Sequence, residues 1–257
     1  MSGEGPAPAA VTFDYWNTLC CEPPGGYLKG RRLEAMSQVL VDAGVGSAGV
    51  VLPVLDVLAA AYDTAWASWH DGWQANRQFT GVDAANSICD ALERTFADSP
   101  AVASLRARLC DVFAAQGEGA ELPLVDGVAD ALAALSERGV RLGIICDVGF
   151  TGSPILLAHL ERHGILEFFD HWSFSDQVGF YKPAPEIFAH ALAGLGNPDP
   201  GRCVHVGDRR RTDVGGARAA GMRAVRITSA FCDPDEDAPE GDAVISSYDE
   251  LLPALGL

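Results

Sequence analysis

Apolar and polar positions follow two different patterns along the chain. From residue 121 onward, short apolar runs of strand length alternate with segments in which apolar residues recur at helical spacing. The strand-like runs are VRLGIIC (140–146), HWSFS (171–175), CVHVGD (203–208), AVRIT (224–228) and DAVIS (242–246). The helical segments between them are 128–138, 153–163, 184–195 and 213–221. This alternation is typical of a doubly wound parallel sheet whose strands are buried by helices on both faces.

The N-terminal part of the chain adds one strand and an insertion. The short run AVTFD ends in Asp14, and it predicts a buried strand that delivers this acid to the edge of the sheet. Between 22 and 120, apolar residues recur at helical spacing with breaks at glycine, which predicts about four or five helices and no strand. We therefore expect an α/β core formed by 8–21 and 121–257, into which an all-helical domain, 22–120, is inserted.

The composition limits the classes of partner. Hydrophobic residues make up 48% of the chain, which is ordinary for a globular protein that buries a sizeable core. The formal net charge is −17, so nucleic acid backbones and anionic membrane surfaces should repel the protein. We expect no nucleic acid and no membrane among its partners. A small substrate handled by a monomer or homodimer is the expectation instead.

The cysteines and the N-terminus bear on the compartment. There are 7 cysteines, an odd number, and no pair has the spacing of zinc ligands. We interpret them as reduced thiols. The first residues lack the basic and apolar segments of a signal peptide, and the apolar stretches are too short to span a bilayer. A cytoplasmic location is therefore expected.

Charged or polar residues follow several of the predicted strands. In open α/β sheets, ligands bind beyond the carboxyl ends of the strands, so these side chains should lie close together. Converging carboxylates are tolerated around a hard cation such as Mg²⁺, and a lysine beside them suits a phosphoryl group. The pattern predicts an anion site with metal, but it leaves open whether a carboxylate attacks phosphorus. The residues concerned are Asp14, Cys146, Asp147, Lys182, Asp208 and Asp213.

Four segments at these strand ends resemble the four motifs of the haloacid dehalogenase superfamily. They are FDYWNTL (13–19), GIICD (143–147), VGFYKPAPEIF (178–188) and VHVGDRRRTDVGGARAAGM (204–222). They occur in the order of the family, each at a predicted strand end. The resemblance covers the core and implies a Rossmann-like fold with a helical cap inserted after the first motif. It also implies a hydrolase, with Mg²⁺-dependent phosphatase activity as the expected chemistry.

The resemblance assigns catalytic and metal-binding roles by position. Asp14 would be the nucleophile and a Mg²⁺ ligand. Lys182 would orient Asp14 and offset the charge of the phosphoryl group. Asp208 would be the other metal-binding acid, and Asp213 would ligate the metal through water or brace it. Trp16 would supply a further metal ligand through its backbone carbonyl.

The same resemblance assigns residues to the substrate. In the second motif of the family, a threonine or serine hydroxyl binds the phosphate. Cys146, or the backbone amide of Asp147, would occupy that place here. Because a thiol donates a weaker hydrogen bond than a hydroxyl, phosphate binding there should depend more on backbone N–H groups. Thr18 would brace the first loop on the substrate-binding side.

Trp16 departs from the phosphatase pattern. The phosphatases of the family usually carry a second aspartate at this position, which protonates the leaving group and then activates water. An indole cannot transfer protons, and a general acid–base group is worth about 10²–10⁴-fold in rate. Three explanations stay open. The substrate has a good leaving group, such as an acyl phosphate; another group, with His70 and Asp71 as candidates, supplies the proton; or catalysis is slow or absent.

Two alternatives to a phosphatase follow from Trp16. The dehalogenase branch of the superfamily also has an aromatic residue at this position, but it uses no metal and lacks the acid at Asp208. A metal-independent, dehalogenase-like hydrolase is therefore one alternative, and a catalytically inactive ligand-binding protein is the other. Because Asp208 is present, we expect a phosphohydrolase that acts on a small phosphorylated metabolite through an aspartyl-phosphate on Asp14.

Two other features favour a structural interpretation. His205 lies within an apolar strand and is expected to be a core histidine. Trp66, Trp69 and Trp73 recur at helical spacing, which favours a core stripe over a binding surface.

Overall fold

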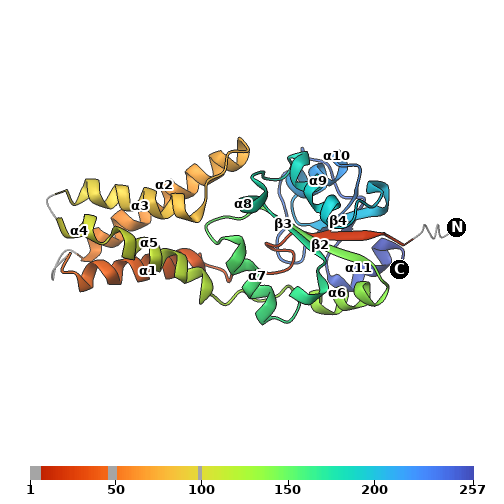
Figure 1. Ribbon diagram of the computed structural model, residues 1–257, viewed down its shortest axis with the longest axis horizontal. Helices are drawn as coiled ribbons and strands as arrows, with labels where there is room; N and C mark the ends of the chain where they lie inside the picture. The colour runs from red at the N-terminus through yellow and green to blue at the C-terminus, as the bar shows by residue number, and fades with distance from the viewer. Residues whose placement is uncertain (1–6, 46–50, 98–99) are drawn as a thin grey trace. The chain divides into compact units, whose positions relative to one another are not determined.

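The structure, a computed structural model, describes residues 7–45, 51–97 and 100–257. The chain divides into two compact units. The core unit consists of Met1–Glu22, Leu122–Asp147 and Leu157–Leu257. The helical unit consists of Pro23–Glu121 together with Val148–Leu156. Figure 1 labels the elements along the chain.

The core unit contains a six-stranded parallel sheet with the strand order β3-β2-β1-β4-β5-β6. The strands are β1 (Ala10–Phe13), β2 (Arg141–Cys146), β3 (His171–Phe174), β4 (Cys203–Gly207), β5 (Arg223–Ile227) and β6 (Ala243–Ile245). The chain order reverses between β1 and β4, which is the switch point where doubly wound sheets bind ligands. The fold class predicted from the alternating pattern is therefore confirmed.

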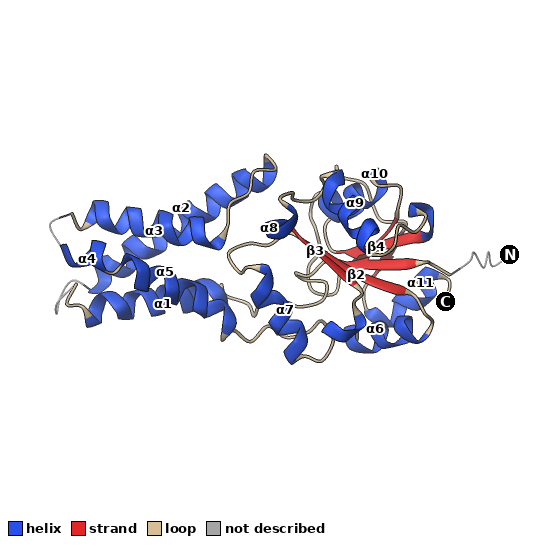
Figure 2. Cartoon of the chain, in the orientation of Figure 1, coloured by secondary structure: helices blue, strands red, loops and turns tan. Residues whose placement is uncertain are grey.

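Helices cover both faces of this sheet. Figure 2 shows α9 and α10 on one side of the strands, and α6 and α11 on the other. The helices C-terminal to residue 121 are α6 (Val128–Glu137), α7 (Ser153–Arg162), α8 (Ser175–Val178), α9 (Pro185–Gly194), α10 (Gly215–Ala219) and α11 (Leu251–Leu255). Short 3₁₀ turns occur at η1 (Leu166–Phe168), η2 (Pro200–Arg202) and η4 (Tyr248–Glu250).

The helix expected at 213–221 differs from the prediction. It starts earlier, as a π-helical turn, η3 (Arg210–Val214), and only then continues as α10. The carboxylate of Asp213 accepts a hydrogen bond from the backbone N–H of Arg209 at 2.8 Å. This contact ties the side chain to the start of the turn, and wide turns of this kind are frequent at functional sites.

The helical unit is built from α1 (Tyr27–Asp42), α2 (Val51–Gln74), α3 (Gly81–Thr95), α4 (Pro100–Ser104) and α5 (Arg106–Glu118). Its described residues contain no strand, as the helical spacing predicted. A continuous apolar core joins the helices, with Met36, Leu58, Ile88, Leu92 and Phe113 fully buried. None of the described helices is long and apolar enough to cross a lipid bilayer.

The segment Val148–Leu156, which follows β2 in the chain, packs with the helices of this unit. The indole Nε1 of Trp69 donates a hydrogen bond to the carbonyl oxygen of Val148 at 3.1 Å. The buried guanidinium of Arg32 donates to the hydroxyl of Thr151 at 2.9 Å. The continuation of the second motif is therefore held by residues of α1 and α2.

A glycine at the start of α3 allows this segment to approach closely. A Cβ atom at Gly81 would lie 2.4 Å from the carbonyl oxygen of Phe150. Gly81→Ala is therefore expected to lower the free energy of unfolding by about 1–3 kcal/mol. Gly30 is the matched control, because a Cβ there meets nothing within 4 Å. Gly30→Ala should stabilise α1 by roughly 0.5–1 kcal/mol. Urea denaturation measures both, and equal effects would contradict the close packing at Gly81.

The tryptophan stripe on α2 is less buried than its spacing predicted. Trp66 and Trp69 stack with their ring centroids 4.8 Å apart, and Trp69 stacks on Trp73 at 6.0 Å. Trp66 is 46% exposed, so the prediction of a core stripe is wrong for this residue. Helical spacing places the three indoles on one face, but it does not say how much of that face other elements cover.

Candidate active site

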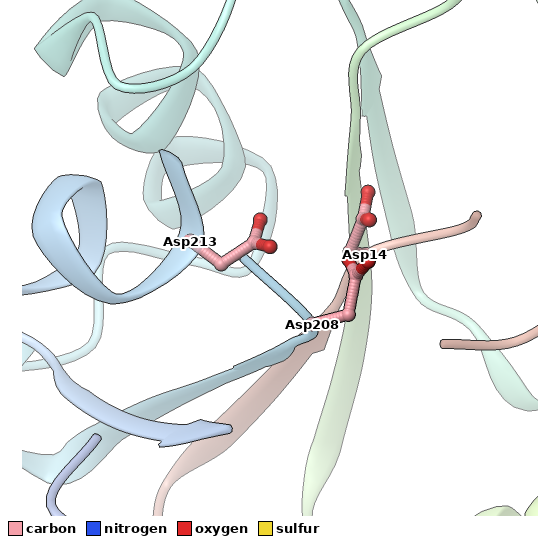
Figure 3. Close-up of side chains that lie close together, drawn as sticks. All are labelled: Asp14, Asp208 and Asp213. Atoms are coloured by element: carbon pink, nitrogen blue, oxygen red, sulfur yellow. The ribbon is translucent and has the colours of Figure 1, made fainter. Parts of the chain in front are cut away.

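Three carboxylates converge where β1 and β4 end. Asp14 follows β1, Asp208 follows β4, and Asp213 lies in η3. The backbone N–H of Asp14 bonds the carbonyl oxygen of Val206, so the two strands stay paired up to this point. The three side chains lie close together (Figure 3). One oxygen from each carboxylate lies within 4.8 Å of the others, and all three side chains are buried. The sequence-based expectation that these acids meet agrees with this geometry.

Lys182, in the loop between α8 and α9, joins two of the acids. Its Nζ donates a hydrogen bond to Asp14 Oδ1 at 2.7 Å and to Asp213 Oδ1 at 2.6 Å. Its backbone N–H donates to Asp147 Oδ1 at 2.8 Å. The lysine is only 2% exposed, so these carboxylates are its counter-charges in place of water. Such charge-assisted bonds fix the ammonium firmly.

The charges of the cluster shift its pKa values in opposite directions. Burial alone would lower the pKa of Lys182, but Asp14 and Asp213 raise it well above its ordinary value. Burial would raise the pKa of Asp213, but the charge of Lys182 and the hydrogen bond from His205 lower it below its ordinary value. Burial raises the pKa of Asp208 well above its ordinary value, and the negative charges of Asp14 and Asp213 raise it further. The charges of Arg209 and Lys182 oppose this shift only in part.

The residues present fit a divalent cation. Burial raises the pKa of Asp14 as well as that of Asp208, so both acids resist ionisation without a further positive charge. With all three carboxylates ionised, the single ammonium leaves two negative charges, which one divalent ion would balance. The buried Oδ1 of Asp208 has no hydrogen-bond partner in the described part of the chain. A buried carboxylate oxygen without a partner is costly unless an ion or water satisfies it. An all-oxygen ligand set of this kind suits Mg²⁺.

Asp213 is hydrogen-bonded on both oxygens. Its Oδ1 accepts from Lys182 and, at 3.3 Å, from His205 Nε2, while its Oδ2 accepts from the backbone N–H of Arg209 at 2.8 Å. Gly207 leaves room for this carboxylate, since a Cβ there would lie 2.3 Å from Asp213 Cγ. The arrangement favours a bracing role for Asp213.

The residues expected at the substrate lie at the same edge of the sheet. Cys146 ends β2 and is fully buried, and burial raises the pKa of its thiol well above the ordinary value, so the thiol stays neutral. Asp147 follows it and accepts the hydrogen bond from Lys182 described above. Thr18 is buried in the loop after β1, and its hydroxyl has no hydrogen-bond partner among the described residues.

The two groups considered as substitutes for a general acid lie in the helical unit. His70 and Asp71 are both exposed on α2. His70 shares a hydrogen bond of 3.1 Å with Gln74, one turn further along the helix. Trp16 itself is half-buried, and its ring meets Tyr15 edge to face with centroids 5.1 Å apart.

Three residues around the site were missed by sequence reasoning. Asn17 Nδ2 donates a hydrogen bond to Asp208 Oδ2 at 3.3 Å, and its φ of 57° is a left-handed conformation that asparagine tolerates. The hydroxyl of Tyr248 donates to the carbonyl oxygen of Thr18 at 2.9 Å and so supports the first loop. His205 was expected only as a core residue. It is buried, but a polar residue three positions before Asp208 was a usable signal.

The chain resembles known phosphatases in part of its length. It is 36% identical over 114 residues to the pyrimidine 5′-nucleotidase YjjG of Escherichia coli (strain K12), which covers 43% of this chain and 48% of that protein. It is 39% identical over 125 residues to a glyceraldehyde 3-phosphate phosphatase of Methanothermobacter thermautotrophicus, which covers 46% and 54%. The chain thus spans about half the length of the curated relatives it matches.

Solved structures share the whole fold. The 2-haloacid dehalogenase from Pseudomonas syringae pv. Tomato DC3000 superposes with a TM-score of 0.68 at 24% identity, covering 96% of this chain and 97% of that chain. This likeness concerns the fold alone. The haloacid dehalogenase-like hydrolase family matches residues 8–221, which include Asp14, Lys182, Asp208 and Asp213. Since that match takes in most of the chain, including these three aspartates and the lysine, the chain belongs to the haloacid dehalogenase-like hydrolase family.

Proposed function

We propose that the chain is a Mg²⁺-dependent phosphohydrolase that cleaves a small phosphorylated metabolite through a phosphoryl group carried on Asp14. The observation that carries this proposal is the buried cluster in which Lys182 bridges Asp14 and Asp213, while one oxygen of Asp208 has no hydrogen-bond partner among the residues that the structure describes. The partial likeness to a nucleotidase and to a sugar phosphate phosphatase supports it.

Asp14 is the proposed nucleophile. Its Oδ1 accepts the hydrogen bond from Lys182, which leaves Oδ2 to attack phosphorus. A bond forms between Oδ2 and phosphorus while the bond from phosphorus to the leaving oxygen breaks. Water then attacks the aspartyl-phosphate, which releases phosphate and restores the carboxylate. Lys182 keeps the carboxylate oriented and offsets charge on the phosphoryl oxygens.

Asp14, Asp208 and the backbone carbonyl of Trp16 are the proposed protein ligands of Mg²⁺. Asp213, whose oxygens already accept three hydrogen bonds, would act through a water or as a brace. When bound, the ion supplies positive charge that stabilises the phosphoryl group during transfer. The hydroxyl of Thr18, the thiol of Cys146 and the backbone amide of Asp147 are the proposed donors to the substrate.

Trp16 sets an expectation for the leaving group. Without an acid at this position, substrates whose leaving group departs unprotonated should be favoured by about 10²–10⁴-fold over alkyl phosphates. Acetyl phosphate and aryl phosphates are such substrates. Trp16→Asp should raise alkyl phosphate turnover more than acetyl phosphate turnover, because only the alkyl leaving group needs the acid, whereas activation of the attacking water is common to both substrates. An enzyme that already hydrolyses both classes equally would instead take its proton from another group.

The test of the proposed function is phosphate release from acetyl phosphate, an aryl phosphate and a panel of alkyl phosphates. The proposal predicts activity with Mg²⁺, loss of activity on adding EDTA, and recovery when Mg²⁺ is restored in excess. Asp208→Asn should raise the Mg²⁺ concentration needed for half-maximal rate by at least about tenfold. Even a residue that only supports a metal ligand is typically worth about 10–100-fold in metal affinity, and Asp208 is a proposed direct ligand. EDTA-resistant halide release from a 2-haloacid would overturn the proposal in favour of a dehalogenase. Mg²⁺ binding without turnover would overturn it in favour of a binding protein.

A further inference from the structure

A buried histidine outside the expected catalytic set contacts the cluster. His205, in the middle of β4, is fully buried. Its Nε2 lies 3.3 Å from Asp213 Oδ1, and its Nδ1 lies 2.8 Å from the hydroxyl oxygen of Thr12 on β1. We propose that His205, oriented by Thr12, is a positioning residue that holds Asp213 where it fixes Lys182 against Asp14. This inference rests on the proposed function.

The strand register explains why these side chains meet. Thr12 and His205 are directly paired across β1 and β4, so their side chains leave the sheet on the same face. Thr12 precedes Asp14 by two residues, which is the repeat of a strand. His205 precedes Gly207 by the same interval, and Gly207 is where Asp213 approaches the strand closely. One face of two neighbouring strands therefore carries both the donor to Asp213 and the space for it.

The hydrogen bonds to Asp213 fix the plane of its carboxylate. Lys182 and His205 both donate to Oδ1, and the Arg209 N–H donates to Oδ2. If the bond from His205 is lost, the carboxylate can rotate about its bond to Cβ. Lys182 would then move with it, away from the position that is 2.7 Å from Asp14. Displacement of a catalytic group by about 1 Å can cost roughly 10²-fold in rate.

The carboxylate of Asp213 assigns one proton of the imidazole. An ionised carboxylate only accepts hydrogen bonds, so Nε2 of His205 must carry a proton toward Asp213. In the neutral imidazole, Nδ1 is then an acceptor and the Thr12 hydroxyl is its donor. Without that hydroxyl, the single proton is free to move to Nδ1. The lone pair of Nε2 would then face the carboxylate and repel it, so Thr12 selects the tautomer that holds Asp213.

A residue that only filled the core would act differently from a donor to Asp213. The ring of Phe188 does pack edge to face on His205, with centroids 5.5 Å apart, so the histidine also contributes to packing. Two amide substitutions separate the two roles. In His205→Gln, the side-chain nitrogen reaches the place of Nε2 and keeps a donor for Asp213. In His205→Asn, the shorter side chain reaches only the place of Nδ1 and keeps the contact with Thr12.

The kinetic test compares these two variants with acetyl phosphate as substrate. His205→Asn is expected to lower kcat by about 10–100-fold with KM changed less than about threefold, because positioning affects the chemical step. His205→Gln should stay within about fivefold of the wild-type kcat. Thermal unfolding is measured in parallel, and both variants should lose similar stability. Equal losses of kcat in the two variants would overturn the proposal.

A second test does not depend on turnover. Nitrogen-15 NMR of the imidazole should show Nε2 protonated in the wild-type protein and in Thr12→Ser. In Thr12→Val, which removes the hydroxyl at nearly constant volume, the Nε2-protonated signal should be reduced. A wild-type signal with an unprotonated Nε2 would overturn the inference even if the enzyme turns over. A further outcome is a wild-type protein that shows the expected tautomers and yet releases no phosphate from any substrate. That result would count against the proposed function but would leave the hydrogen bonds from Thr12 to His205 and from His205 to Asp213 supported.

Discussion

Asp14→Asn is expected to abolish phosphate release, with kcat falling by a factor on the order of 10⁴ or more. The amide has nearly the same shape as the carboxylate, but it is a far weaker nucleophile toward phosphorus. It also removes the anion that accepts the 2.7 Å hydrogen bond from Lys182. Steady-state phosphate release from acetyl phosphate in excess Mg²⁺ measures the loss.

A matched surface substitution serves as control for this variant. Asp249 is an exposed aspartate of η4 in the same unit, and Asp249→Asn should leave kcat unchanged. Circular dichroism should show both variants folded. If Asp14→Asn kept a kcat within tenfold of the wild-type value, Asp14 would not be the nucleophile, and the proposed role of the first motif would be lost.

Lys182→Met should lower activity and stability together. The substitution keeps the length of the side chain but leaves two buried carboxylates, Asp14 and Asp213, without their shared cation. Breaking a buried ion pair on one side costs about 3–5 kcal/mol of unfolding free energy. The loss of a preorganised charge at the phosphoryl group should lower kcat by roughly 10²–10³-fold.

A double variant separates the two effects of Lys182. Combining Lys182→Met with Asp213→Asn removes one of the stranded charges, so the double variant should regain part of the stability lost by the single one. Its kcat should stay low, because the ammonium is still missing beside Asp14. Chemical denaturation and phosphate release measure the two quantities. A double variant less stable than Lys182→Met would contradict the ion-pair explanation.

The strand ends explain how much of the site could be predicted. Each strand that bears a motif was visible as a short apolar run, and parallel strands bring their carboxyl ends to one edge. This rule alone placed Asp14, Asp208 and Asp213 together, and the structure brings their oxygens within 4.8 Å. The family resemblance then added roles that charge patterns do not supply.

The rest of the site depended on register, which the sequence did not reveal. Thr12 and His205 are separated by 193 positions, and only the direct pairing of β1 with β4 brings them together. His205 stood out as a polar residue in an apolar strand, but nothing in either strand pointed to Thr12 as its partner. The contact between Tyr248 and the first loop spans 230 positions and was hidden for the same reason.

The sequence likewise did not show that the segment after β2 leaves the core unit at Asp147 and packs with the helical unit from Val148 onward. Val148–Leu156 packs with the helical unit because Trp69 and Arg32 hydrogen-bond to it and Gly81 lets its backbone approach. A short segment that mixes apolar residues, polar residues and two glycines carries no periodicity that says which neighbour it contacts. Partners of that kind become visible only when the surrounding helices are placed.

The most direct test of the central claim is to trap the covalent intermediate. The protein is mixed with radiolabelled acetyl phosphate and Mg²⁺, quenched in acid within the first turnover, and digested for peptide analysis. Phosphoryl label is expected on Asp14, and it should be absent with EDTA and absent in Asp14→Asn. Steady phosphate release without label on Asp14, or label on another residue, would contradict this mechanism.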